Sequence, residues 1–291
     1  MTPSDHSDIY RLDLALPPGT AALRVAVAET TTILAEIADP RFTVAARVHS
    51  FRKTTKRLRA LFRLIRSGFP DYKEANATFR DMARLFTSHR DARVMAGLVE
   101  NLGRSRTADP VVDWFDYRAE AAERLAAGKL QALPGPLQEA LVRFNAWDFD
   151  SVSRDDVLQG FRKTFDVVVE QSDLVNDESE SEEAHEWRKQ CKDHWYHLRL
   201  LEDALPANER NKIEGYDRLG DLLGSVHDRD VLMHHLEALP EFLKETRQAT
   251  AIARAAWRER RAMQAEAIEL SATLLDEHPR KLESKIRRKW R

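Results

Sequence analysis

The chain has 291 residues, of which 32% are charged, with a net charge of -2 and a sequence pI near 6.6. A duplex-DNA-binding domain is usually basic as a whole, so this near-neutral balance argues against one. The single cysteine, Cys191, excludes an intramolecular disulfide, and there is no run of about 18 apolar residues to predict a membrane span. Glycines and prolines are few, 10 and 11, so we expect an all-α protein. A single cysteine fits a reducing compartment and no charged-then-apolar leader is visible, so we expect a cytoplasmic protein without a signal peptide.

Helical periodicity dominates the first half, and no segment alternates as a strand would. The expected elements, in order, are an N-terminal tail (1–18) and helices over 19–38, 48–66, 72–103 (one or two) and 109–128. The second of these helices stops at Gly68-Phe69-Pro70. Leu133-Pro134-Gly135-Pro136 then interrupts the pattern, and residues 133–154 are interpreted as a connector.

The second half repeats this order of elements. We expect a helix at 155–172, an acidic loop at 176–183, a helix at 184–202, long helical segments from 226 to 276 and a terminal basic helix from 279. Breaks are expected at Pro206 and near Gly220–Gly224, since proline and glycine interrupt helices.

One basic pattern occurs twice. Residues 48–66 are VHSFRKTTKRLRALFRLIR and residues 184–202 are AHEWRKQCKDHWYHLRLLE. The matched pairs are His49 with His185, Arg52 with Arg188, Lys53 with Lys189, Lys56 with Lys192, and Arg63 with Arg199. At 3.6 residues per turn, these positions fall within an arc of roughly 120° on one helical face. Each helix is therefore predicted to present a cationic stripe.

The opposite face of each basic helix is predicted to enter the core. In the first copy it carries Leu58 and Leu61, and Phe51 matches Trp187 of the second copy as a core anchor. His194 and His197 lie on this face, so we interpret them as partly buried core residues rather than ligands.

The distribution of charge indicates a confined polyanion site. Between Pro40 and Pro70 there are nine basic residues and no acidic one, whereas acidic residues are concentrated elsewhere, notably in Asp177–Glu183. A local basic patch on a near-neutral protein attracts a polyanion without making the whole molecule cationic.

A second correspondence lies at nearly the same offset of 136 residues. Ser88-His89-Arg90-Asp91 matches Ser225-Val226-His227-Asp228, and each is followed three positions later by a valine. Two matches at one spacing predict an internal duplication, with a first repeat at 19–132 and a second at 155–290. The duplication in turn predicts two helical bundles related by a pseudo-twofold axis.

These residues resemble the CHAD family, the conserved histidine α-helical domain. Its signature is a histidine followed by Arg-Lys and further basic residues, with a downstream element similar to LFTSHRDARV at Leu85–Val94 and LGDLLGSVHDRDV at Leu219–Val231. The resemblance covers residues 19–290. It implies two four-helix bundles that face each other, and binding of inorganic polyphosphate in a basic groove or channel between them. The ExExK motif of the triphosphate-tunnel domain, fused to some members, is absent. The resemblance therefore implies binding without catalysis, metal or cofactor.

Phosphate chains carry no bases, so recognition must come from charged hydrogen bonds, through the arginine fork and the lysine point charge. The predicted ligands are His49, Arg52, Lys53, Lys56, Arg59, Arg63, His185, Arg188, Lys189, Lys192 and Arg199. A neighbouring polyanion would favour the protonated form of the two histidines. Asp91 and Asp228 are expected to hold basic side chains in position.

The two copies differ, and the differences predict an asymmetric site. The second has His194 and Trp195 where the first has Leu58 and Arg59. It also has His227 and Asp230 where the first has Arg90 and Arg93, so fewer cationic contacts are expected from the second half.

Two other functions stay open at this point. A metal-dependent phosphohydrolase could use His227-Asp228, with His185 and His194 upstream and Asp230 downstream. The first half has Arg90 at the place of His227, and an arginine is a poor metal ligand. A general polyanion or nucleic-acid module is favoured by the basic stripes and by the end of the chain, Lys285–Arg291, but no recognition motif or aromatic stacking platform accompanies them. Specific nucleic-acid binding and a membrane partner are not expected, whereas association with polyphosphate granules is.

Overall fold

The computed structural model describes residues 9–103, 109–176 and 181–290, and these contain helices and loops but no β-strand. The α-helices are α1 (Pro18–Ala38), α2 (Val44–Ile65), α3 (Tyr72–Arg84), α4 (Thr87–Gly103), α5 (Pro110–Gln131), α6 (Pro134–Phe144), α7 (Arg154–Leu174), α8 (Ser181–Leu200), α9 (Ala207–Arg210), α10 (Ile213–Glu237), α11 (Glu241–Lys244), α12 (Arg247–Leu274) and α13 (Pro279–Lys289), with a 3-10 turn, η1 (Glu202–Ala204). The all-α prediction is confirmed.

Local sequence sets where the main helices begin. Thr43 caps α2, its hydroxyl accepting from the backbone N–H of Ala46 at 3.2 Å. Ser153 and Asp156 form a reciprocal capping box at the start of α7. Pro18 and Pro110 occupy the first turns of α1 and α5, where a missing N–H costs nothing.

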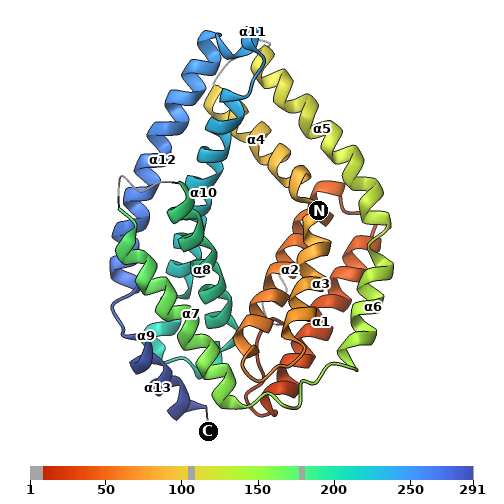
Figure 1. The fold of residues 1–291 in the computed structure, drawn as a ribbon, viewed down its shortest axis with the longest axis vertical. Helices are drawn as coiled ribbons and strands as arrows, with labels where there is room; N and C mark the ends of the chain where they lie inside the picture. Colours follow the sequence, from red (N-terminus) through yellow and green to blue (C-terminus); the bar gives the residue numbers. More distant parts are fainter. Residues whose placement is uncertain (1–8, 104–108, 177–180, 291) are drawn as a thin grey trace.

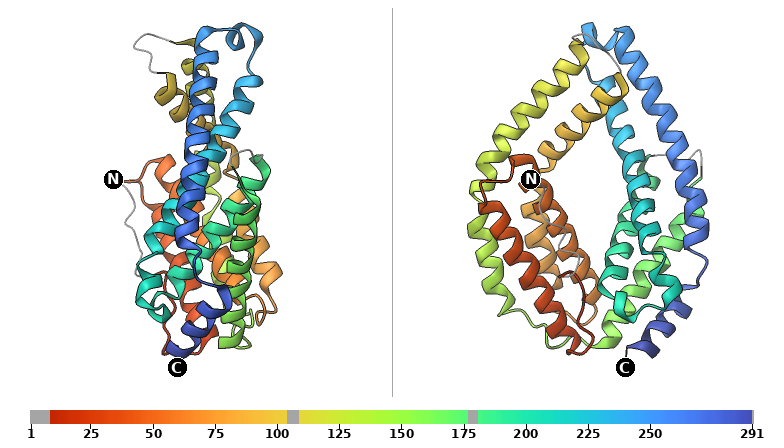
Figure 2. Two further views of the ribbon diagram at one scale, coloured as in Figure 1. Left: turned by 90° about the vertical axis from the view of Figure 1, so that its left-hand side faces the viewer. Right: turned by 180° about the vertical axis from the view of Figure 1, so that it is seen from behind.

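The helices form two arms that enclose an opening (Figure 1). One arm contains α1 to α6 and the other contains α7 to α13, and the same opening separates them when the molecule is seen from behind (Figure 2). At the lower end α2 packs against α7 and α8, and at the upper end α4 packs against α10 and α12. The arms therefore meet twice and close a ring.

Each meeting point has its own apolar core. The lower core joins both arms and includes Phe51 and Phe62 of α2 with Phe161 of α7. The upper core is separate, and Val99 of α4 packs there with residues of α5, α10 and α12, among them Ile252. Two apolar contacts thus hold the ring shut around a polar interior.

Alternate residues of segment 9–17 pack into the lower core, although the sequence indicates only a tail there. Tyr10 and Leu12 are buried. The Tyr10 hydroxyl donates to the Arg57 carbonyl at 2.8 Å, and the Leu12 N–H donates to the Leu200 carbonyl at 2.9 Å. This segment therefore ties α2 to α8, while residues 1–8 of the predicted tail lie outside the described residues.

The expected break near Gly220–Gly224 is wrong, because α10 runs without interruption through both glycines. The reason lies in another helix. A Cβ at Gly220 would lie 2.6 Å from Cε of Lys192, and one at Gly224 would lie 3.3 Å from Nε of Arg188. The glycines leave room for two α8 side chains, and this packing offsets their poor helix propensity.

The apolar faces of the basic helices enter the core as predicted. Phe51 and Trp187 are fully buried, and so are His194 and His197. His194 stacks on Phe165 with ring centroids 4.4 Å apart, and Nε2 of His197 donates to the Ala60 carbonyl at 2.9 Å. Burial lowers the pKa of His197 to about 3, so this histidine is neutral and structural.

Candidate functional site

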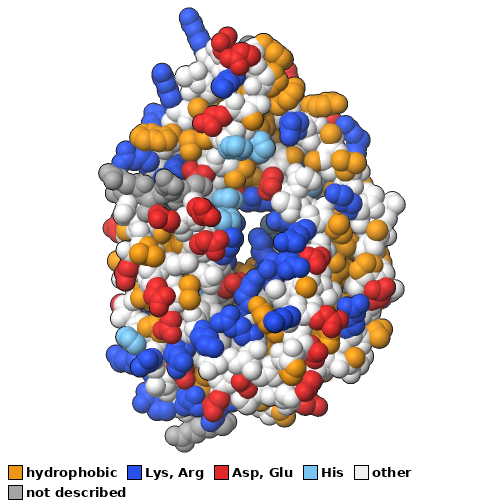
Figure 3. All heavy atoms as spheres, viewed as in Figure 1, with side chains coloured by type: hydrophobic (Ala, Val, Ile, Leu, Met, Phe, Trp, Pro, Cys, Tyr) orange, Lys and Arg blue, Asp and Glu red, His pale blue; other side chains and the backbone are white. Residues whose placement is uncertain are grey.

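A cavity of about 810 Å³ lies between the two arms, lined by residues of α2, α4, α8 and α10. Its basic and histidine lining is His49, Arg52, Lys53, Lys56, His89, Arg90, Arg93, Arg188 and Lys192. In the space-filling view, Lys and Arg side chains gather around a hollow in the middle of the molecule (Figure 3). We call this space the first cavity.

A second cavity of about 430 Å³ adjoins the first. Its basic lining is Lys56, Arg59, Arg63, Arg66, Lys163, Arg188, Lys189 and Lys192. Four residues line both spaces, namely Lys56, Arg188, Lys192 and Tyr196, and we call them the junction. Three of the four are cations, contributed by both basic helices.

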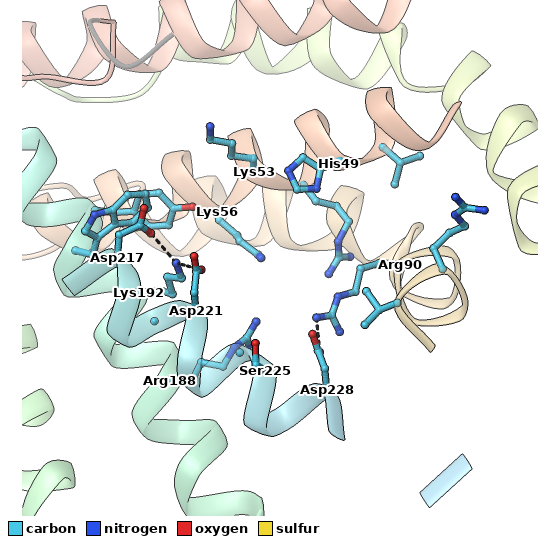
Figure 4. Close-up of a pocket in the computed structure, with 18 of the residues that line it drawn as sticks. His49, Lys53, Lys56, Arg90, Arg188, Lys192, Asp217, Asp221, Ser225 and Asp228 are labelled. Atoms are coloured by element: carbon cyan, nitrogen blue, oxygen red, sulfur yellow. Dashed lines mark hydrogen bonds and ion pairs between the residues drawn. The ribbon is translucent and has the colours of Figure 1, made fainter. Parts of the chain in front are cut away.

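Two junction cations face the interior without a carboxylate at ion-pair distance among the described residues. Lys56 and Arg188 point toward each other from opposite walls (Figure 4), and neither forms an ion pair within the described part of the chain. Burial together with neighbouring cations, Arg188 first, lowers the pKa of Lys56 to about 8. Burial and Arg90 likewise lower the pKa of Arg188. Uncompensated positive charge of this kind favours an anionic ligand.

Arg90 is a cation of the first cavity that the sequence reasoning left out of the ligand set. Its guanidinium donates to Asp228 at 2.6 Å and to Asp91 at 3.1 Å. These are the two carboxylates predicted to hold a basic side chain in position, and here they hold one arginine from both arms at once. The adjacency of Arg90 to Asp91 in the downstream motif was the signal that could have identified it.

Lys192 contrasts with Lys56. Its Nζ lies 2.9 Å from Oδ1 of Asp217 and 2.8 Å from Oδ1 of Asp221, and its ammonium also lies over the ring of Trp195 (Figure 4). Neither aspartate was predicted, because both lie on α10, away from the repeated basic pattern. The two equivalent lysines therefore differ in their ion pairing.

Not every predicted ligand lines a cavity. His185 stacks on His227 with ring centroids 4.2 Å apart, and Arg199 lies 3.8 Å from Glu202 and over the ring of Trp195; neither belongs to either lining. The other nine predicted ligands line at least one cavity. Arg66, Arg93 and Lys163 join them without having been predicted, because they lie off the repeated stripe.

Some predicted ligands are already engaged. Arg63 donates to Asp193 at 2.7 Å, and Lys189 pairs with Glu186 in the same helix. Arg59 donates to the side-chain oxygen of Asn76 at 3.0 Å. More of the basic side chains in the second cavity are therefore already paired than in the junction.

The two histidines predicted as ligands have lowered pKa values in the free protein. Burial and then Lys53 lower the pKa of His49, while burial and then His227 lower that of His185 to about 4. An anion bound beside His49 would oppose both effects.

The His227-Asp228 pair is used for packing and for an ion pair. His227 stacks on His185 and Asp228 accepts from Arg90, and no group of three or more potential metal ligands exists within the residues that the structure describes. This geometry gives no support to a metal-dependent phosphohydrolase. Of the basic C-terminal end, Lys285–Lys289 belongs to α13, and Arg291 lies outside the described residues.

Comparisons with known proteins identify the family. The model of the CHAD domain family matches residues 36–237, which is more than half of the chain, so the chain belongs to this family. The crystal structure of the CHAD domain from the plant Ricinus communis superposes with a TM-score of 0.64 at 16% identity, covering 97% of this chain and 91% of that one. This similarity shows a shared fold over nearly the whole chain. No curated protein matches its sequence. Among the described helices, none is long and apolar enough to cross a membrane.

Proposed function

We propose that the protein binds inorganic polyphosphate, without catalysis, in the two adjoining cavities between its arms. The observation that carries the proposal is the junction, where Lys56 and Arg188 come from the two basic helices and face the same space without a carboxylate partner in the described residues. A flexible chain of phosphates supplies many charges to such a space and needs no shape-specific pocket.

The lining fits a phosphate chain rather than an isolated phosphate. Cations continue from Arg52 and Arg90 in the first cavity, through the junction, to Arg59 and Arg63 in the second. A linear polyanion can contact these groups in succession, and each contact releases condensed counterions. Such a protein would be retained where polyphosphate accumulates, so cytoplasmic granules of this polymer are part of the proposal.

A general polyanion binder is the second candidate, favoured by the same unpaired cations. It predicts equal affinity for polyphosphate and for single-stranded DNA with the same number of phosphates.

Calorimetric titration with long-chain polyphosphate tests the proposal. The Lys56→Gln/Arg188→Gln variant should bind about 100-fold more weakly, since two charge-assisted contacts of roughly 1.4 kcal/mol each are lost. The slope of log affinity against log salt should become shallower by about two. Lys73→Gln/Arg124→Gln, which removes the same charges from exposed positions outside both cavities, should bind within threefold of wild type. Equal loss in both variants would show that net charge, not the junction, determines binding.

A further inference from the structure

Lys56 and Lys192 occupy equivalent positions in the two basic helices and line the same junction, yet their surroundings are opposite. Lys192 is held by Asp217 and Asp221 at 2.9 and 2.8 Å, whereas Lys56 pairs with no described carboxylate. The second arm therefore places two more carboxylates in a mainly cationic site, in addition to Asp228, which pairs with Arg90, and Asp193, which pairs with Arg63.

The two aspartates are in the path of a ligand. Both line the first cavity beside Lys56 and Arg188, and their side chains are 44% and 74% exposed. Figure 4 shows Lys192 between these carboxylates. The contact depends on Gly220, because a side chain there would collide with the methylenes of Lys192 and push its ammonium away from the carboxylates.

A phosphate that binds Lys192 competes with this pair for its ammonium. The positive charge that Asp217 and Asp221 hold is then shared with an anion that lies close to both carboxylates, and their repulsion opposes binding. The repulsion by the two carboxylates is offset only if the ligand contacts several other cations at the same time. Lys56, Arg188 and Arg52 are available nearby.

The spacing of charge along the polymer decides whether the ligand can contact several other cations at the same time. In polyphosphate, neighbouring phosphorus atoms share a bridging oxygen, so charged groups follow one another closely. In a nucleic acid a sugar separates successive phosphates, so fewer of them can reach the junction together. The carboxylates therefore disfavour the second polymer more than the first, which is specificity through repulsion.

We infer that Asp217 and Asp221 are selectivity residues, an inference that rests on the proposed function. They keep polyanions of low linear charge density, nucleic acids above all, out of the polyphosphate site. Lys192 exchanges its carboxylate partners for phosphate when the denser polymer binds.

The experiment compares affinities for long-chain polyphosphate and for oligo(dT) with the same number of phosphates, at one salt concentration. In Asp217→Asn/Asp221→Asn, binding of oligo(dT) should tighten at least tenfold and that of polyphosphate less than threefold, so the preference for polyphosphate falls. Glu237→Gln/Glu241→Gln is the matched control, since it makes the same change in net charge at exposed positions at the outer end of α10 and on α11. It should leave the preference within twofold of wild type.

The outcomes separate the two proposals. If wild type prefers polyphosphate and the aspartate variant tightens both polymers equally, or neither, the selectivity role is wrong while the proposed function stands. If wild type binds both polymers equally, the aspartates provide no selection. If wild type binds no polyphosphate, the proposed function fails and the inference fails with it. Circular dichroism of each variant shows whether the helices are retained.

Discussion

Lys56 destabilises the free protein while it prepares the site. Its side chain is accessible from the cavity, but the cavity walls partly desolvate the ammonium. This desolvation, together with the charges of Arg188, Arg52, Arg90 and Lys192, lowers the pKa of Lys56 from 10.5 to about 8. Below pH 8 the folded protein holds this unfavourable charge, which the unfolded chain carries freely. The unfolded state therefore binds more protons between about pH 8 and 10.5, and stability from this group rises across that range.

Replacing the ammonium with an apolar group should remove this penalty. Lys56→Met is expected to raise the free energy of unfolding at pH 7 by about 1 kcal/mol, a value discounted for the screening of an exposed charge. Polyphosphate affinity should fall at the same time. Urea unfolding at pH 7 and 10.5 measures the effect, and the gain should shrink at the higher pH. Lys73→Met, at an exposed position of α3, serves as the control. A gain that is independent of pH would contradict the role of charge.

At the scale of elements, the crossing of α7 over α2 brings two backbones together. A Cβ at Gly160 would lie 1.9 Å from the Leu64 carbonyl oxygen, so only glycine allows this approach. The crossing joins the two arms at the lower core and positions α2 beside α8. The site depends on it because Lys56 and Arg188 lie on those two helices.

Gly160→Ala should therefore be strongly destabilising, by about 2–3 kcal/mol or more, because backbone rather than a flexible side chain must move. Gly97→Ala in α4 is a matched control, since nothing lies within 4 Å of its added Cβ. That change should stabilise by about 0.5–1 kcal/mol through helix propensity. Thermal unfolding of both variants measures the difference. Similar effects at the two positions would rule out the steric account.

Periodicity predicts most of these helices because each helix buries one face. The apolar residues of that face recur at helical spacing within a single segment of the sequence. The basic stripes predict Lys56, Arg188 and Lys192 for the same reason. Properties that depend on a distant partner are not accessible in this way. The continuity of α10 at Gly220 depends on Lys192 of α8, and burial of Tyr10 depends on a groove formed by other segments.

The same limit explains where the predicted ligands and the residues that line the cavities differ. The basic stripe of α8 includes Arg199, but this residue lines neither cavity. Its side chain lies beside Glu202 and Trp195 instead. Arg90 is brought to the site by α4, outside the repeated stripe. The internal duplication and its twofold axis stay predictions.

For the whole molecule, the presence of two separate cores predicts that the two contacts between the arms can open independently of each other. Ile252 in the upper core and Ile286 in the lower core are both fully buried. Ile252→Ala should cost about 2–5 kcal/mol and speed hydrogen exchange chiefly in α4, α5 and α12. Ile286→Ala should instead act on α7 and α13. If both variants accelerated exchange everywhere equally, the ring would be one cooperative unit.

The upper core has a consequence for biosynthesis. Its first part, around Met95, Val99 and Phe115, leaves the ribosome long before the part around Ile252 that covers it. At about 5–20 residues per second, the earlier helices wait roughly 7–27 s with an apolar face uncovered. A nascent chain stalled in this interval exposes an apolar surface that the finished protein buries, so the order of translation leaves this surface accessible to chaperones before the upper end closes.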